Sequence, residues 1–376
     1  MKGVASCRET AREVTMQRDP IALDMPSVPP LTRAQMTNAI ERRGGDIPRT
    51  PLGWAKFYNG GTIDKYGARL HHLNESVVDD YVSLSYTSPG DLRAPAGAPA
   101  DYRWSIEDDR GDLHGEGFTS RLVVSSTDLI DDFIAAIPSP DSPAYFERAV
   151  AAAEANPDRY LLAWDFFCLF ERAWFLFGME EIMCEMLDNP DRVKRLLRAF
   201  TDYHKVVIDR FAEVGADGYF TSDDLAGQDD LLFSEDAFRD MYLPFYEELA
   251  DHCHSRGMHF WFHTDGAIER IMPDLVAIGV DTLHPMQEPP MDLPDLATAY
   301  GRDITFHVGI DIQYLLPGGT PAEVEEGTKR LIDICDRSEG GCMLAASNGI
   351  MPETPLENIE AFLRTAVTYG AEKHGS

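Results

Sequence analysis

The sequence predicts an α/β protein built as a (β/α)8 TIM barrel. Two observations in the C-terminal half carry this prediction: short strands that are apolar throughout alternate with amphipathic helices, and polar residues follow each strand. Strands of this kind are typical of a parallel sheet covered on both faces. A doubly wound open sheet is the alternative. It is weaker because no strand is followed by a GxGxxG or GxxxxGK sequence.

The first part of the chain predicts fewer elements. Residues 1–30 are expected to form an N-terminal extension without a signal peptide, and residues 31–376 a single barrel domain. Thr32 and Gln35 have the spacing of a capping box, which predicts a helix to about Glu41. A strand is expected around residues 50–57.

An insertion is expected between barrel elements. Residues 89–100 are rich in Pro, Ala and Gly and predict a loop. Residues 102–106 and 113–118 flank a turn-rich acidic run, which predicts an inserted β-hairpin.

The second half of the chain predicts six strands that end in polar groups. These strands are residues 160–164, 218–221, 258–262, 282–284, 304–308 and 343–346.

The helices between these strands have clear start and stop signals. Thr320 begins a capping box followed by Pro, and Thr354 begins the same pattern. Ser234 is expected to cap a helix that Pro244 kinks, and Gly279 to close a helix that begins near residue 268.

The composition excludes several classes of protein. The 64 acidic residues outnumber the 33 basic ones, for a formal charge of −31, so binding to nucleic acid or to an anionic membrane is not expected. No apolar run is long enough to span a bilayer. The six cysteines include no CxxC pair, and reduced thiols are expected. A cytoplasmic protein follows from these observations.

Three groups of residues at predicted strand ends could perform chemistry. His263 and Asp265 leave one strand together, and this pair can ligate a divalent metal or act as an acid–base pair. Asp223 and Asp224 leave the preceding strand, and alternation predicts that only one of them faces the barrel axis. Glu171 lies among aromatic residues, where its pKa rises unless Arg172 pairs with it.

We therefore expect catalytic roles for Asp223, Asp224, His263 and Glu171. The candidate metal ligands are His263 and Asp265, with Glu171 as a third. Other polar or aromatic side chains near strand ends are candidates for substrate binding: Gln228, Gln287, His284, Asp311, Asn348 and Trp174. His307 lies within a strand and is expected to be a satisfied histidine of the barrel interior.

The order of these motifs resembles the uroporphyrinogen decarboxylase (URO-D) superfamily, which includes cobalamin- and methylcobamide-dependent methyltransferases. The resemblance covers about residues 31–370 and is densest after residue 160. The motifs that carry it are Phe170-Glu171-Arg172-Ala173-Trp174, Asp223-Asp224-Leu225-Ala226-Gly227-Gln228, His263-Thr264-Asp265-Gly266, Met291-Asp292-Leu293, Gly309-Ile310-Asp311 and Asn348-Gly349-Ile350-Met351-Pro352.

Within the superfamily, the resemblance implies either decarboxylation or methyl transfer. Uroporphyrinogen decarboxylases carry an early motif rich in Arg and Gly that binds the propionates of the porphyrin precursor. The corresponding residues 51–60 contain no Arg. A substrate with many carboxylates needs several cationic partners, so this departure disfavours a carboxy-lyase acting on a tetrapyrrole.

The methyltransferase branch binds zinc through a His-x-Cys pair and a later Cys. His263 matches the histidine, whereas Asp265 and Asn348 occupy the two cysteine positions. Such a site is harder and suits oxygen ligands better than thiols.

The most favoured function is therefore a methyltransferase-like activity at the C-terminal mouth of the barrel, with a corrinoid or a tetrahydrofolate-type pterin as methyl carrier. Decarboxylation is the alternative, and a non-catalytic ligand-binding barrel is the third. The expected partners are a small-molecule substrate, a corrinoid protein and, in a homodimer, a second copy of the chain.

Overall fold

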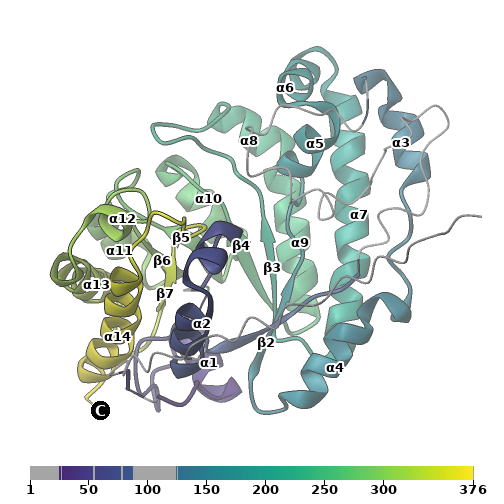
Figure 1. The fold of residues 1–376 in the computed structure, drawn as a ribbon. Helices are drawn as coiled ribbons and strands as arrows, with labels where there is room; N and C mark the ends of the chain where they lie inside the picture. The colour runs from purple at the N-terminus through teal and green to yellow at the C-terminus, as the bar shows by residue number, and fades with distance from the viewer. Residues whose placement is uncertain are drawn as a thin grey trace, which may run out of the picture.

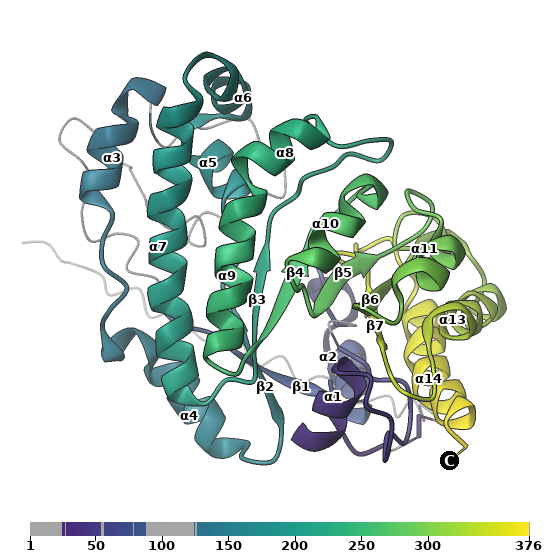
Figure 2. The ribbon, with the colours of Figure 1, turned by 180° about the vertical axis from the view of Figure 1, so that it is seen from behind.

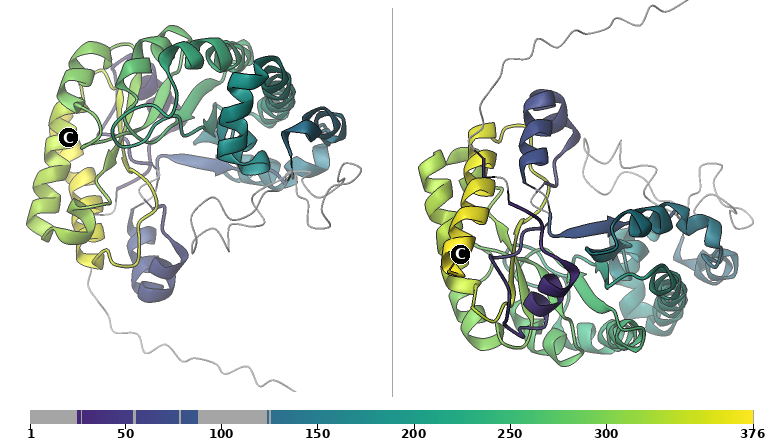
Figure 3. Two further views of the ribbon diagram at one scale, coloured as in Figure 1. Left: turned by 90° about the horizontal axis from the view of Figure 1, so that it is seen from above. Right: turned by 90° about the horizontal axis from the view of Figure 1, so that it is seen from below.

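The fold is a curled parallel sheet with helices on its outer side (Figures 1 and 3). The computed structural model describes residues 25–26, 28–53, 56–77, 79–87, 124 and 126–375. Within these ranges the sheet has seven strands, arranged in chain order from β1 to β7. They are β1 (Tyr81–Leu84), β2 (Tyr160–Trp164), β3 (Gly218–Ser222), β4 (His259–His263), β5 (Thr282–Met286), β6 (Thr305–Ile310) and β7 (Cys342–Ala346).

Helices α7, α8, α9 and α10 lie on the convex face of this sheet (Figure 2). The bounds of the helices are α1 (Arg33–Ile40), α2 (Gly60–Ser76), α3 (Ile130–Ala136), α4 (Glu147–Ala155), α5 (Phe170–Phe177), α6 (Met179–Asp188), α7 (Pro190–Val214), α8 (Glu235–Met241), α9 (Leu243–Ser255), α10 (Met272–Ala277), α11 (Leu293–Tyr300), α12 (Leu315–Gly318), α13 (Pro321–Cys335) and α14 (Leu356–Lys373). Short 3-10 turns precede α3, α4 and α10.

Large side chains fill the inside of the curled sheet. Tyr160, Phe220 and Trp261 are fully buried there, and Met36 and Ile40 of α1 pack against them from below. Because the strands are buried on both faces, their sequences show no apolar–polar alternation. Each strand is therefore a continuous apolar run in the sequence, and the six strands predicted from such runs are all present at nearly the predicted positions.

The described residues of the range 50–57, which leave out 54 and 55, form no strand, and the sheet of the described residues holds seven strands and not eight. Residues 51–53, the seam segment, lie between β7 and β1 instead. Leu344 donates its N–H to the Pro51 carbonyl (2.9 Å) and accepts from Gly53 N–H (3.0 Å), and Asp80 N–H donates to the Leu52 carbonyl (2.8 Å). Pro51 has no N–H to donate and Gly53 adds no side chain, so the segment forms bridges and not a ladder.

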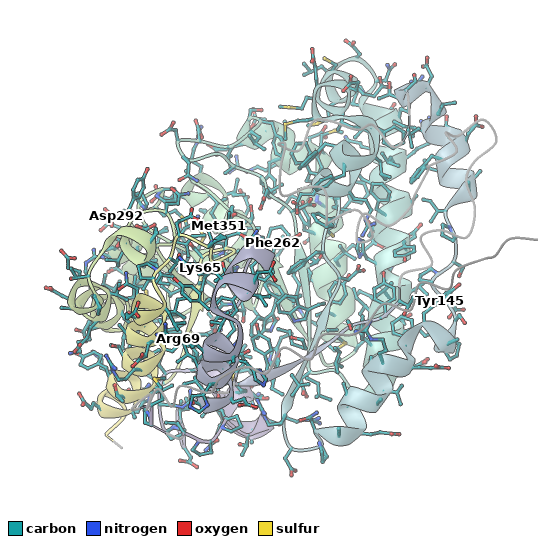
Figure 4. All side chains as sticks on the ribbon, viewed as in Figure 1. Lys65, Arg69, Tyr145, Phe262, Asp292 and Met351 are labelled. Atoms are coloured by element: carbon teal, nitrogen blue, oxygen red, sulfur yellow. The ribbon has the colours of Figure 1, made fainter. Side chains whose placement is uncertain are left out.

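Helix α2 lies beside this seam and contacts the loop that follows β7. Lys65 donates to the Pro352 carbonyl (2.6 Å), and Arg69 pairs with Glu357 (3.5 Å). Figure 4 labels Lys65 and Arg69 on this helix and Met351 in the neighbouring loop.

Most predicted helix signals are confirmed. Thr32 and Thr320 both form complete capping boxes, and Ser234 accepts from Ala237 N–H at the start of α8. Pro244 has a stronger effect than a kink, because α8 and α9 separate at Tyr242.

One predicted cap is wrong. Helix α14 begins at Leu356 with Pro355 as its N-cap and has no side-chain cap. Thr354 is fully buried in the preceding loop, where its N–H donates to the Met351 carbonyl and its own carbonyl accepts from Tyr66. These contacts hold Thr354 out of the capping position.

The inserted β-hairpin and nearly all of the N-terminal extension lie outside the described residues and remain predictions. In the part of the chain that is described, no helix combines the length and the apolar character that crossing a bilayer requires.

Candidate functional site

The candidate site lies at the edge of the sheet formed by the carboxyl ends of the strands, here called the mouth. His263 is the last residue of β4, and the parallel register pairs it with Ser222 of β3 and with His284 of β5. Asp224 follows β3 by two residues, and Asp265 follows β4 by two residues. The pairing of these strands therefore brings the predicted strand-end groups to one edge.

Three of these side chains form a compact set, the His263 cluster, made of Asp224, His263 and Asp265. His263 Nε2 lies 3.6 Å from Asp224 Oδ1 and 3.9 Å from Asp265 Oδ1. One candidate ligand atom from each residue lies within 4.8 Å of the others. His263 is nearly buried, and Asp224 is the most exposed of the three.

Asp265 is fixed by its neighbours and is desolvated. Its N–H donates to Asp224 Oδ1 (3.0 Å), and Asn348 Nδ2 donates to its Oδ2 (2.6 Å). Its Oδ1 is buried and accepts no hydrogen bond from any residue that the structure describes. Burial raises the pKa of Asp265 to about 6, with Asp224 adding to the rise and His263 and Asn348 opposing it.

Glu171 supplies a buried carboxyl next to the cluster. Ser222 Oγ donates to its Oε2 (2.7 Å), and the side chain is almost completely buried. Burial raises the pKa of Glu171 well above its ordinary value, and the charges of Asp224 and Asp223 raise it further. Burial therefore favours the protonated form of Glu171, which makes this carboxyl a candidate proton donor.

Asp223 occupies a different environment from Asp224. Its Oδ2 accepts from Leu169 N–H (2.7 Å), Phe170 N–H (2.9 Å) and Tyr246 hydroxyl (2.6 Å), and its Oδ1 accepts from Glu171 N–H (2.5 Å). The carboxylate thus binds the N-terminus of α5, where unpaired N–H groups favour an anion. Asp223 holds the backbone that carries Glu171, and Asp224 is the acid of this pair that meets His263.

Behind His263, two more histidines continue into the interior of the curled sheet. His263 Nδ1 and His284 Nδ1 share a hydrogen bond (2.7 Å), and His284 Nε2 lies 3.1 Å from the Ala346 carbonyl. The His284 and His307 rings are 4.5 Å apart, and His307 Nε2 lies 3.0 Å from the Gly53 carbonyl.

Both inner histidines are fully buried. Burial lowers the pKa of His284 well below its ordinary value, helped by His307 and His263, and burial lowers the pKa of His307 to about 3. His284 is expected from sequence to bind substrate, and the structure places it against His263. The signal that could have shown this is that two consecutive parallel strands each carry a histidine near their carboxyl end.

The other predicted site residues do not join the cluster. Asp311 follows β6 and accepts from the N–H groups of Gln313 (2.7 Å) and Leu315 (3.0 Å), which caps the next turn. Gln228 is exposed, and Gln287 is partly buried just after β5. Trp174 is stacked on Phe175 with ring centroids 4.0 Å apart.

The predicted partner of Glu171 is engaged elsewhere. Arg172 donates to the carbonyls of Phe166 (3.0 Å) and Phe167 (2.7 Å) and lies 3.9 Å from Asp165. It therefore stabilises the loop between β2 and α5.

The residues of the His263 cluster fit a divalent cation. They offer one imidazole nitrogen and carboxylate oxygens, and the buried Asp265 Oδ1 has no hydrogen-bond donor among the described residues. Two adjacent carboxylates in a desolvated site favour a bound cation. Among the described residues, the cluster includes Asp224 in place of the predicted Glu171 and contains no cysteine. The site therefore suits a metal ion that prefers oxygen and nitrogen ligands to thiolates.

Comparisons with known proteins bear on the family and on the fold. The sequence profile of uroporphyrinogen decarboxylase (URO-D) matches residues 170–369. The methylated-thiol–coenzyme M methyltransferase of Methanosarcina mazei is 24% identical over 195 residues, which are 52% of this chain and 50% of that protein. The match therefore spans half the length of that relative.

A solved structure shares the fold over most of the chain. A methyltransferase from Methanosarcina mazei superposes with a TM-score of 0.59 at 18% identity, covering 90% of this chain and 98% of that one.

Proposed function

Because the chain belongs to the uroporphyrinogen decarboxylase family, we propose that it is an enzyme of methyltransferase type, with its site at the mouth of the barrel. The reaction moves a methyl group between a small substrate and a corrinoid or pterin carrier, with a corrinoid protein as the expected partner. The observation that carries the proposal is the His263 cluster: an imidazole and two carboxylates meet where three strand-end loops converge.

A divalent metal would be held by His263, Asp265 and Asp224. When bound, such a metal supplies a Lewis acid that lowers the pKa of a coordinated oxygen or nitrogen group. The oxygen-rich donor set favours an oxygen or nitrogen substrate over a thiol. This is where we expect the chain to differ from the curated relative, whose name specifies methylated thiols.

The neighbouring residues orient the cluster and supply a proton. Asn348 fixes Asp265 through its amide, so that the buried Oδ1 stays turned toward His263. Glu171, whose pKa burial raises, would deliver a proton to a leaving group. The Phe166 ring lies near the His263 ring, with centroids 6.1 Å apart, and adds an apolar group beside the cluster.

Uroporphyrinogen decarboxylation is the second candidate, favoured by the family and by the raised pKa of Glu171. Against it, the cationic groups near the described part of the mouth are already engaged. Arg172 binds backbone carbonyls, and Lys56 donates to the carbonyls of Asn74 and Val77. Each missing charged hydrogen bond to a propionate costs about 1.5–3 kcal/mol, so several such losses reduce binding by orders of magnitude.

Elemental analysis tests the metal site. We expect one divalent ion per chain in the purified protein, lost in His263→Ala and in Asp265→Asn. Asp230→Asn is the matched control, because Asp230 is an exposed acid on the loop after β3 that pairs with Arg270. Metal retained in His263→Ala, or lost on alkylating the cysteines, would contradict the assignment.

A paired assay tests the reaction. Methylation of cob(I)alamin or of a corrinoid protein is followed by absorbance with methoxylated and N-methylated donors, beside turnover of uroporphyrinogen. We expect methylation and no coproporphyrinogen. The reverse result would favour the decarboxylase, and ligand binding without turnover in either assay would favour a binding barrel.

A further inference from the structure

The two loops that carry the acids of the His263 cluster are bonded to each other. One loop follows β3 and the other follows β4. Leu225 N–H of the first loop donates to Thr264 Oγ1 of the second (3.1 Å). In the other direction, Ala267 N–H of the second loop donates to the Gly227 carbonyl of the first (2.8 Å). The loops therefore form a junction directly beside the cluster.

The close approach of the two loops depends on Gly266. Its φ is +95°, in the left-handed region, and a Cβ at this position would lie 2.3 Å from the Gly227 carbonyl oxygen and 2.8 Å from the Ala226 carbonyl oxygen. Only glycine fits between the two backbones at these distances. The junction is therefore a contact of backbone against backbone, which leaves the loops little room to shift relative to each other.

Thr264 supplies the side-chain contact of this junction. It stands between His263 and Asp265 in the sequence and is fully buried, and its N–H donates to the His284 carbonyl of β5 (2.8 Å). Leu225 is fully buried as well, so its N–H needs an acceptor inside the protein. The Thr264 hydroxyl oxygen is that acceptor.

We propose that Thr264 is a positioning residue, whose buried hydroxyl holds the two loops together so that Asp224 and Asp265 form a pair before any cation binds. The hydroxyl bonds the residue that directly follows Asp224, and Thr264 itself directly precedes Asp265. In this arrangement Asp265 N–H reaches Asp224 Oδ1 (3.0 Å). Ligand atoms that are fixed in advance lose less conformational freedom on binding. This consequence for cation binding rests on the proposed function, whereas the junction does not.

The junction is tested without metal, by hydrogen–deuterium exchange of the full chain after treatment with a chelator. Thr264→Val keeps the shape of the side chain and removes the acceptor, whereas Thr264→Ser keeps the acceptor. We expect amide exchange in residues 224–228 to be about tenfold faster than in the wild type for Thr264→Val, and within about threefold of it for Thr264→Ser. Equal exchange in the two variants would overturn the proposal, whether or not the protein binds metal.

The consequence for binding is measured with Zn²⁺ in competition with a chromophoric chelator. We expect Thr264→Val to bind Zn²⁺ about tenfold to a hundredfold more weakly than the wild type, and Thr264→Ser to bind it within about threefold. Unchanged Zn²⁺ affinity in a folded Thr264→Val whose loop exchanges fast would contradict the positioning role. A wild type that binds no Zn²⁺, with the exchange results as expected, would refute the metal site and leave the positioning of the two acids intact.

Thr328→Val is the matched control. Thr328 is also fully buried, but its hydroxyl donates to the Val324 carbonyl within α13 (2.7 Å), a helix that packs against β6 and α14. Amide exchange in residues 224–228 and Zn²⁺ affinity should both match those of the wild type in this variant. Changes in Thr328→Val as large as those in Thr264→Val would show that general destabilisation causes the effect, and would overturn the proposal.

Discussion

At the scale of single residues, the adjacent acids Asp223 and Asp224 do different work. Asp223 accepts three backbone N–H groups at the start of α5 and the Tyr246 hydroxyl. Asp224 accepts one N–H, from Asp265, and its charge lies beside His263. Their roles differ because successive residues of an extended chain point in opposite directions.

Asp223→Asn and Asp224→Asn should therefore have opposite consequences. Asp223→Asn removes acceptors from buried N–H groups and should lower the free energy of unfolding by about 1–3 kcal/mol. Asp224→Asn keeps the oxygen that accepts from Asp265 and relieves charge repulsion, so stability should change by less than about 0.5 kcal/mol while metal is lost. Urea denaturation of both metal-free variants measures this, and equal destabilisation would contradict the assignment.

The buried His307 should make the protein sensitive to acid. Burial lowers its pKa to about 3 in the folded protein, while an unfolded histidine titrates near 6.5. Between these values the unfolded chain binds one more proton, so stability is full above about pH 6.5 and falls as the pH falls toward 3.

His307→Gln should remove this contribution. Between pH 6 and 4 the slope of unfolding free energy against pH should decrease by about 1.4 kcal/mol per pH unit. His71→Gln removes an exposed histidine that pairs with Glu75 and is the control. Denaturation curves collected across this pH range measure the slope. An unchanged slope in His307→Gln would refute the prediction.

At the scale of elements, one sequence pattern has two outcomes. Thr320 and Thr354 both precede a Pro and are followed three residues later by Glu. Only Thr320 caps a helix, accepting from Glu323 N–H while the Glu323 carboxylate accepts from Thr320 N–H. Thr354 is buried in a loop, and its Oγ1 has no hydrogen-bond partner within the described ranges.

Replacing each threonine by the similarly shaped valine should separate the two outcomes. Thr320→Val removes the N-cap of α13 and should cost about 0.5–2 kcal/mol of stability. Thr354→Val replaces a buried, unsatisfied hydroxyl by a methyl group and should be neutral or stabilising. Thermal unfolding of the two variants compares them directly, and a loss in Thr354→Val as large as that in Thr320→Val would contradict this reading.

At the scale of the whole molecule, the curled sheet is joined at the seam segment, residues 51–53, between β7 and β1. The approach is close at Gly53. A Cβ at this position would lie 2.2 Å from the Tyr81 ring, whose side chain is buried in the sheet interior. Because Tyr81 packs against Trp261, its ring cannot move away freely.

Gly53→Ala should therefore destabilise the protein by about 1–3 kcal/mol through overpacking. Gly60→Ala is the control, because a Cβ at this first residue of α2 has no atom within 4 Å. Alanine at the start of the helix should be neutral or slightly stabilising. Chemical denaturation checks both, and a tolerated Gly53→Ala would show that the seam is looser than the contacts indicate.

The order of secondary structure and the place of the site could be predicted because both depend on local patterns. Continuous apolar runs located six strands, and the residue types that follow them located His263, Asp265 and Asn348 at one edge. The strand expected at residues 50–57 could not be judged in this way, because its pairing depends on β1 and β7, which are distant in the sequence.

The sequence by itself determined the parallel sheet and the strand ends that carry the polar groups, because periodicity and capping act over a few neighbouring residues, and the order of its motifs indicated the family. Only the tertiary structure decided that Asp224 faces His263, that Asp223 binds the start of α5, and that His284 shares a hydrogen bond with His263. These roles depend on hydrogen-bond partners that lie about 20 to 50 residues away. A pattern of residue types contains no information about which of two adjacent acids such a partner will meet.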